Sequence, residues 1–257
     1  MLLVIDVGNT NTSLGVFKGP ELVAHWRLTT EHSRTGDEYG VQARNLFELA
    51  GLDFKTIDAI AIASVVPPLN YTLKRMSEVY FHLTPLFVDN TTNTGLPILY
   101  EPPGDVGADR IVDAVAAIHK YSAPCIIVDF GTATTFNAIN KNGEYLGGVI
   151  TPGIMISTDA LFEHTAKLPR VDIKRPQNVI GASTVTAMQS GLYHGYVGLV
   201  DGVLRKMLSE LGGARVIATG GLASLIATGS ELIELVDDTL TLEGLRLVYE
   251  RSRESGV

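Results

Sequence analysis

The sequence contains only one cysteine, Cys125, in 257 residues, which excludes a disulfide framework and makes a cysteine-based metal site implausible. Basic residues are too scattered for a nucleic-acid partner, and the formal net charge is -8. No apolar run reaches the roughly 18 residues that span a bilayer, and the N-terminus lacks the basic leader of a signal peptide. These absences predict a cytoplasmic protein with neither a nucleic-acid partner nor a membrane anchor.

What is present is typical of an α/β protein. The composition is 46% hydrophobic with 26 glycines, and short apolar runs alternate with amphipathic segments. We predict strands at 2–5, 13–17, 22–28, 57–66, 85–88 and 216–218, and helices over 37–50, 70–81, 108–121, 183–211 and 222–227. Residues 89–107 are rich in Thr, Asn, Pro and Gly and predict a long loop.

The second half of the chain repeats the opening. Residues 125–135 align with residues 2–12 at a constant offset of 123 positions. Each copy is an apolar strand, an aspartate, one apolar residue, a glycine and a Thr-rich turn leading into a hairpin. Chance is the alternative explanation for so short a match. Duplication predicts two related lobes, 1–120 and 121–257, with a nucleotide cleft between them.

The turn that begins at Asp6 carries groups suited to phosphate chemistry. A carboxylate at a strand end can hold hydrated Mg²⁺, Gly8 permits close approach of the backbone to a phosphate, and Asn and Thr side chains donate to phosphate oxygens. The alternative is a plain hairpin turn. Asp129, Gly131 and Thr132 form a second copy, and this repetition favours phosphate binding.

Two further motifs add to this interpretation. Gly220 and Gly221 follow a strand and can pack a nucleoside close to the backbone, although paired glycines also open helices without a ligand. Asp109 begins the helix over 108–121, where a carboxylate is favoured by the helix dipole by about 0.3–1 kcal/mol; Asp105 could fill that role too. Arg110 offers a bidentate fork for a carboxylate. The chain has no P-loop and no dinucleotide fingerprint.

In this order, the motifs resemble the phosphate 1, phosphate 2 and adenosine motifs of the actin, sugar kinase and Hsp70 superfamily. Within it, DVGNTNT at 6–12, GADR at 107–110 and DFGTATT at 129–135 resemble type III pantothenate kinases. The resemblance extends over most of the chain, to Gly221. It implies duplicated actin-like (ribonuclease H-like) lobes, and ATP-dependent phosphorylation of pantothenate to 4′-phosphopantothenate, the first step of coenzyme A synthesis. It also implies a homodimer that needs Mg²⁺ and a monovalent cation, K⁺ or NH₄⁺.

The resemblance also implies roles for individual residues. Asp109 is the general base, Asp129 holds the monovalent cation, and Asp6 holds Mg²⁺ directly or through water. The residues expected to bind ATP are Asp6, Val7, Gly8, Asn9, Thr10, Asn11, Thr12, Ser13, Thr132, Gly220 and Gly221. Those expected to bind pantothenate are Tyr100, Gly107, Ala108, Asp109, Arg110 and Thr184. From the residues alone, Tyr100 could simply cover the core, and Thr184 could simply neighbour a helix cap at Ser183.

Two questions stay open at this level. Four glycines, at 191, 195, 198 and 202, recur in the helix over 183–211, each costing ~1 kcal/mol of helix propensity. Close packing within a lobe or across a dimer interface could compensate, and we favour the dimer. The alternative functions are a kinase of the same fold with another hydroxylated substrate, and a nucleotide-binding regulatory protein that has lost catalysis.

Overall fold

The computed structural model describes residues 1–89 and 91–254, which divide into two compact units. Among the described residues, the first unit contains 1–96, 100–116 and the C-terminal helix, and the second contains 97–99 and 117–239. The prediction of a division at residue 120 did not include the return of the C-terminal helix to the first unit. In the described part of the chain, no helix is long and apolar enough to cross a membrane.

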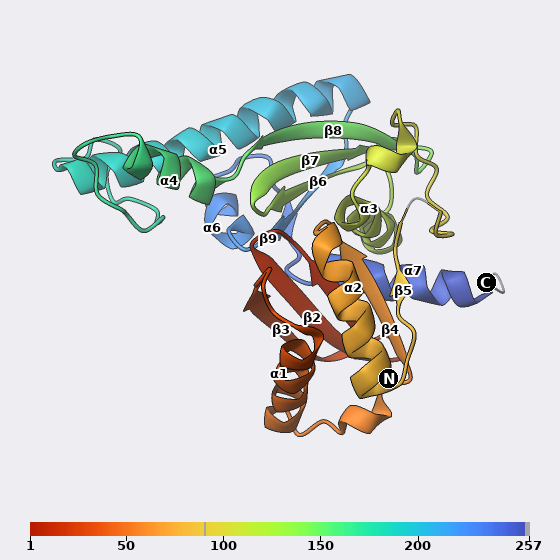
Figure 1. The fold of residues 1–257 in the computed structure, drawn as a ribbon. Coiled ribbons are helices and arrows are strands. Elements are labelled where there is room, and N and C mark those ends of the chain that lie inside the picture. Colours follow the sequence, from red (N-terminus) through yellow and green to blue (C-terminus); the bar gives the residue numbers. More distant parts are fainter. Residues whose placement is uncertain (90, 255–257) are drawn as a thin grey trace. The chain divides into compact units, whose positions relative to one another are not determined.

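The first unit is built on a five-stranded mixed sheet with the order β3-β2-β1-β4-β5 (Figure 1). Its strands are β1 (Leu2–Val7), β2 (Asn11–Lys18), β3 (Glu21–Thr29), β4 (Ala59–Ser64) and β5 (Leu86–Phe87). Because β1 pairs antiparallel with β2 and parallel with β4, the C-terminal ends of β1 and β4 lie side by side at one edge of the sheet.

Helices cover both faces of this sheet, since side chains alternate along each strand. The helices are α1 (Gly36–Leu49), α2 (Pro67–Met76), α3 (Ala108–Tyr121), of which residues 108–116 belong to this unit, and α7 (Leu240–Glu254). Leu3 and Ile5 of β1 pack with α1 and α2 in one core cluster. On the opposite face, a Cβ added at Gly15 would lie 3.2 Å from Leu242 of α7. The sheet is therefore enclosed between two helical layers.

The second unit repeats this plan with the strand order β10-β9-β6-β7-β8. Its strands are β6 (Cys125–Phe130), β7 (Ala133–Ile139), β8 (Tyr145–Pro152), β9 (Arg215–Gly220) and β10 (Leu235–Val236), and its helices are α4 (Ile154–Glu163), α5 (Thr184–Leu211) and α6 (Ala223–Ala227). β6 pairs antiparallel with β7 and parallel with β9, as β1 does with β2 and β4. The predicted duplicated α/β fold is confirmed by this shared topology.

Among the predicted helices, α2 differs most from the structure in its bounds. α2 begins at Pro67 rather than at residue 70, because proline suits the first turn, where its missing N–H is not needed. α2 ends at Met76 and continues as a π-helical segment, Ser77–Phe81. By contrast, α3 has the predicted bounds, and α5 begins after the predicted cap residue Ser183.

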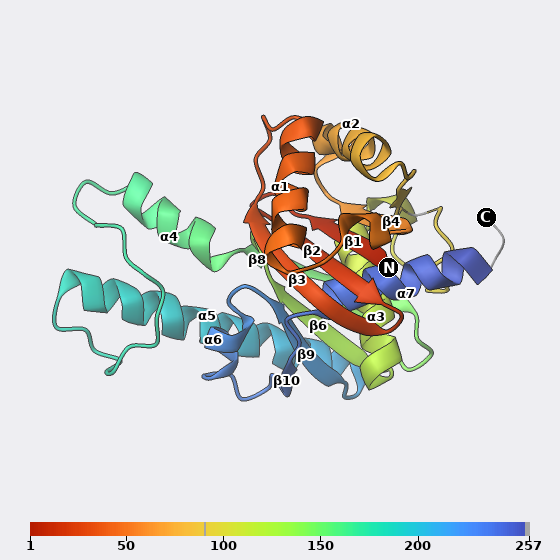
Figure 2. The same ribbon diagram turned by 90° about the horizontal axis from the view of Figure 1, so that it is seen from below.

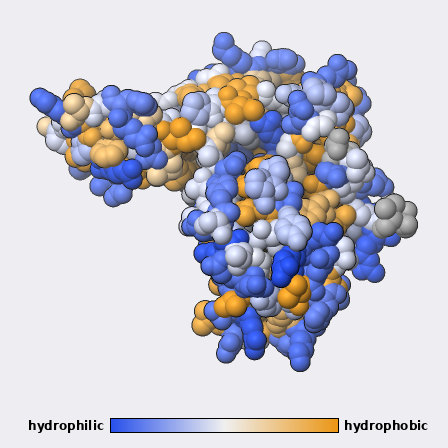
Figure 3. Space-filling view, viewed as in Figure 1, coloured by the Kyte–Doolittle hydropathy of each residue, from blue (hydrophilic) through white to orange (hydrophobic). Residues whose placement is uncertain are grey.

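The long helix α5 extends beyond its sheet within the second unit. Its C-terminal part packs on the sheet through residues such as Val200 and Leu204, whereas its N-terminal part runs past the strands with α4 beside it (Figure 2). Apolar residues lie among polar ones on the surface of this protruding part (Figure 3). Exposed apolar residues are also found on α4, at Met155 and Ile156, and in the segment before α5, at Val179 and Ile180.

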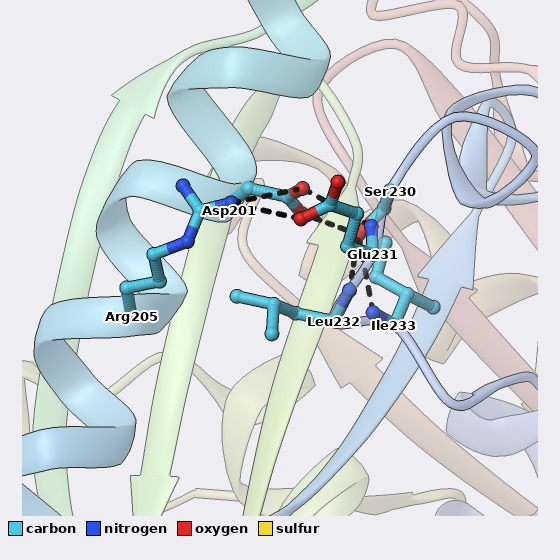
Figure 4. A network of polar contacts seen from close by, with 6 residues as sticks. All are labelled: Asp201, Arg205, Ser230, Glu231, Leu232 and Ile233. Carbon is cyan, nitrogen blue, oxygen red and sulfur yellow. Dashed lines mark hydrogen bonds and ion pairs between the residues drawn. The ribbon is translucent and has the colours of Figure 1, made fainter.

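A buried carboxylate ties α5 to the segment between α6 and β10 (Figure 4). Asp201, only 4% exposed, accepts a hydrogen bond of 2.5 Å from the Ser230 hydroxyl and one of 3.1 Å from the Glu231 backbone N–H. Ser230 Oγ in turn accepts from the backbone N–H groups of Leu232 and Ile233. The exposed Arg205 lies 3.2 Å from Glu231 and 3.9 Å from Asp201.

We expect Asp201→Ala to lower the free energy of unfolding of the second unit by about 1–3 kcal/mol, because it removes the shared acceptor of two hydrogen bonds, a carboxylate that is only 4% exposed. Glu231→Ala is the matched control, since its pair with Arg205 is exposed and should contribute less than about 1 kcal/mol. Urea denaturation of both variants measures the difference. Equal midpoints would show that the Asp201 network does not stabilise this unit.

Candidate functional site

The predicted first phosphate loop, the turn that follows Asp6 and leads into β2, is a tight turn at the C-terminal end of β1. Asp6 is half-buried and pairs with Ser13 across the hairpin. The Gly8 N–H donates to the Asn11 carbonyl at 2.9 Å, and a Cβ on Gly8 would lie only 3.0 Å from that oxygen. Gly8 therefore permits a turn that a larger residue would open.

The residues at the tip and flanks of this loop differ in exposure. Asn9 and Thr10 are exposed, Asn11 and Ser13 are half-buried, and Val7 is buried. Thr12 is also buried, at 2% exposure, with its hydroxyl 2.9 Å from that of Thr30. The structure therefore places Thr12 beneath the loop, where it supports the turn, instead of on its exposed surface.

The GADR segment lies at the same edge of the first sheet as Asp6. Val65, just after β4, donates its N–H to the Val7 carbonyl at 3.0 Å, and a Cβ on Gly107 would lie 3.5 Å from the Val65 side chain. A larger residue at 107 would also collide with the Asp109 carboxylate. Gly107 thus leaves the space that the Asp109 side chain occupies.

Asp109 stands in the first turn of α3, and its Oδ1 accepts a hydrogen bond from the Arg110 N–H at 2.8 Å. Burial raises the pKa of the Asp109 carboxyl, and the Arg110 N–H and guanidinium charge offset this effect only in part. A half-buried carboxylate with a raised pKa is a better proton acceptor than an exposed one. The segment can therefore supply a general base with a cation beside it.

The predicted second phosphate loop, residues 129–132, lies at the end of β6 in the second unit. Asp129 pairs with Thr219 of the parallel strand β9, and a Cβ on Gly220 would collide with its carboxylate and lie 2.7 Å from the Phe130 nitrogen. Gly220 has a φ of +92°, a conformation that favours glycine. A Cβ on Gly131 would also approach the Asp129 carboxylate, at 3.3 Å. These two glycines thus leave the space that the Asp129 carboxylate itself occupies.

Thr132, the predicted ATP contact, lies in a turn supported from below by Gly153. A Cβ on Gly153 would collide with the Thr132 carbonyl oxygen, so the two backbones approach closely. The Tyr196 hydroxyl of α5 donates to the Pro152 carbonyl and lies 2.9 Å from the Ser157 hydroxyl. These contacts connect α5 to the second loop. Neither Gly153 nor Tyr196 was singled out from the sequence, because neither belongs to a recognisable motif.

The structure brings the predicted residues together as two groups. One edge of the sheet in the first unit carries Asp6, the turn after it and residues 107–110. The corresponding edge in the second unit carries Asp129, Thr132, Gly220 and Gly221. Tyr100 is half-buried in the first unit. Thr184 is exposed at the start of α5, at the end of that helix that lies beyond the sheet, and is not grouped with Asp129.

Single carboxylates, not clusters, are available for a metal. Within residues 1–89 and 91–254, no group of three or more His, Cys, Asp or Glu side chains could hold an ion. A lone carboxylate at a strand end suits Mg²⁺, which keeps several waters and is bound by one or two carboxylates together with substrate phosphates. Asp6 fits this pattern. Asp129 is likewise a single carboxylate near a strand end.

The comparisons with known proteins agree on one family. A family model described as type III pantothenate kinase matches residues 2–206. A type III pantothenate kinase of Anaeromyxobacter sp. (strain Fw109-5) is 59% identical, covering 98% of this chain and 100% of the relative. One of Koribacter versatilis (strain Ellin345) is 56% identical, covering 99% and 97%.

A solved structure shows the fold. The inorganic polyphosphate/ATP-glucomannokinase from Arthrobacter sp. strain KM superposes with a TM-score of 0.51 at 12% identity, covering 99% of this chain and 98% of that chain. At that identity the likeness concerns the fold alone. It agrees with the two-lobed actin-like architecture predicted from the duplicated motifs.

Proposed function

Because the chain belongs to the type III pantothenate kinase family, we propose that it transfers the γ-phosphoryl group of ATP to the hydroxyl of pantothenate. The product is 4′-phosphopantothenate, and the reaction is the first step of coenzyme A synthesis. The observation that carries this proposal is the GADR segment, in which a half-buried carboxylate and a guanidinium stand together at the start of α3. ATP as the phosphoryl donor favours a cytoplasmic location.

In this proposal Asp109 accepts the proton of the pantothenate hydroxyl as the phosphoryl group transfers. The transition state of phosphoryl transfer is loose, so positioning and charge stabilisation contribute more than a strong base does. Arg110 binds the pantothenate carboxylate through its fork of N–H donors. Gly107, Ala108 and Tyr100 line the same site, and the turn that follows Asp6 binds ATP phosphates.

A nucleotide site of this family needs a divalent metal, and we propose Mg²⁺ held by Asp6, directly or through water. Such an ion, when bound, would neutralise charge on the phosphates. Asp129 would hold a monovalent cation, K⁺ or NH₄⁺, through its carboxylate. Thr132 and Gly221 would then contact ATP. Asp6 and Asp129 are thus expected to bind different cations.

We further propose a homodimer that buries the glycine-bearing face of α5. A Cβ added at any of the four glycines 191, 195, 198 and 202 meets nothing within 4 Å in this chain. Packing inside the unit therefore does not explain these glycines, whereas close approach of a second copy would. Thr184, exposed at the start of α5, would then reach the pantothenate of the neighbouring subunit.

We expect Gly195→Leu to disrupt this dimer while the monomer keeps its fold, because the new side chain enters open space in the monomer and a close contact in the dimer. Overpacking such a contact costs roughly 1–3 kcal/mol. KM for pantothenate should rise more than KM for ATP. Light scattering and kinetics measure both, with Asn45→Leu, at an exposed position of α1 in the first unit, as control. A fully active wild-type monomer would contradict the shared pocket.

A panel of acceptors tests the proposed reaction against its alternatives. ADP release is followed with pantothenate, several sugars and short hydroxy acids, each with ATP, Mg²⁺ and K⁺. We expect turnover with pantothenate alone. Turnover with another acceptor would indicate a kinase of the same fold with a different substrate, and ATP binding without ADP release would indicate a regulatory protein.

A further inference from the structure

Thr30, the residue directly after β3, makes three hydrogen bonds to the first phosphate loop. Its backbone N–H donates to the Thr10 carbonyl at 2.9 Å, and its hydroxyl donates to the Gly8 carbonyl at 2.7 Å. Its hydroxyl oxygen also lies 2.9 Å from the hydroxyl of Thr12. We propose that Thr30 is a positioning residue, which fixes the orientation of the loop that binds the nucleotide phosphates. This inference rests on the proposed kinase function and deepens it.

The direction of the hydroxyl chain follows from counting protons. A threonine hydroxyl has one proton to donate, and that of Thr30 goes to the Gly8 carbonyl. The bond between the two hydroxyls must therefore be donated by Thr12. Thr12 has then used its only proton and cannot donate to a phosphate. The hydrogen bonds run from Thr12 through Thr30 to the Gly8 carbonyl, and Thr30 is the member that bonds to the backbone of the loop.

This series of hydrogen bonds fixes the orientation of a peptide group at the tip of the loop. In a trans peptide the C=O and the following N–H point in opposite directions. The Gly8 carbonyl points toward Thr30, so the N–H of the exposed Asn9 points away from it. Successive backbone N–H groups turned outward in a tight turn form an anion-binding site. Thr30 thus holds the loop in the orientation that a phosphate needs.

Because these groups are buried, the series of hydrogen bonds depends on a hydroxyl at position 30. Thr12 is 2% exposed and Thr30 is 7% exposed, so water cannot readily replace a lost bond. Thr30→Val keeps the shape of the side chain but leaves the Gly8 carbonyl and the Thr12 hydroxyl without their partner. The peptide group after Gly8 is then free to rotate, and the loop loses its single orientation. Thr30→Ser restores the hydroxyl.

The test compares Thr30→Val, Thr30→Ser and Thr12→Val, with ATP affinity measured by calorimetry and kcat and KM measured for both substrates. We expect Thr30→Val to weaken ATP binding and lower kcat/KM for ATP about 10–100-fold, since small misplacements of a reactant are costly. KM for pantothenate should stay unchanged. Thr30→Ser should lie near wild type, and Thr12→Val should have a smaller effect than Thr30→Val.

Ser77→Ala is the matched control for the loss of a buried hydroxyl bond in the same unit. Ser77 is fully buried and donates to the Leu73 carbonyl at 2.8 Å, outside the phosphate loop. It should change the melting temperature without changing ATP affinity. Wild-type ATP affinity in Thr30→Val would overturn the proposal, as would equal losses of affinity in Thr30→Val and Ser77→Ala. If Thr30→Val does not fold, reduced ATP affinity in Thr12→Val still supports the proposed role of these hydrogen bonds, and unchanged affinity opposes it.

Calorimetric ATP affinity does not require turnover. A wild-type protein that binds ATP but leaves pantothenate unphosphorylated would refute the proposed function and still allow the role of Thr30 to be tested.

Discussion

Asp109→Asn should lower kcat about 10²–10⁴-fold, the range expected when a positioned general base is lost. The change is nearly isosteric, so the fold and ATP affinity should be preserved. Because burial raises the pKa of the Asp109 carboxyl, the acid limb of kcat/KM in the wild type should lie above the usual aspartate pKa of about 3.9. Activity requires the deprotonated form, so it falls as pH decreases through that limb.

Asp105→Asn is the matched control for this prediction. Asp105 is an exposed carboxylate in the short helical turn just before α3, so its loss tests whether any negative charge near the start of that helix suffices. The control should retain near-normal kcat and the acid limb. A wild-type kcat in Asp109→Asn would remove this residue from the mechanism.

The second large effect is expected at Asp129. Asp129→Ala should lower activity about 10²-fold or more, as is typical when one preorganised electrostatic contact is lost, and should remove the dependence on K⁺ or NH₄⁺. Gly220→Ala should also lower activity and the response to K⁺, because its methyl group would collide with the Asp129 carboxylate and with the backbone of Phe130. Rates measured in K⁺, NH₄⁺ and a bulky organic cation show the dependence.

Gly212→Ala separates backbone strain from an effect on the cation site. Gly212 also has a positive φ, +72°, but a Cβ there meets nothing within 4 Å. The Gly212→Ala variant should therefore lose some stability but keep its response to K⁺, whereas the Gly220→Ala variant should lose that response. Equal rates of the wild type in all monovalent salts would contradict the assignment of Asp129.

Elements with a strong local pattern could be predicted from the sequence. α3 has the predicted bounds because its alanine-rich segment is helical by propensity, and β1 and β6 were recognised because each is an apolar run that ends near an aspartate. The motif residues around Asp6 and Asp129 also lie at strand ends as expected. These features are local, so a single sequence can reveal them.

Features that depend on distant contacts could not be predicted. α7 joins the first unit because Gly244 packs closely on the backbone of Val112, which lies far away in the sequence. α4 was missed because its apolar residues are largely exposed and carry no clear helical period. Thr30 shows no motif, and its role became visible only when β3 brought it against the loop after β1.

The most direct test of the proposed reaction is to identify its product. Purified protein is incubated with ATP, pantothenate, Mg²⁺ and K⁺, and the mixture is analysed by mass spectrometry beside Asp109→Asn under the same conditions. We expect 4′-phosphopantothenate and ADP in equal amounts from the wild type, and a strongly reduced yield of both from the variant. ADP without phosphopantothenate, or no ADP at all, would contradict the assignment of this chain as a pantothenate kinase.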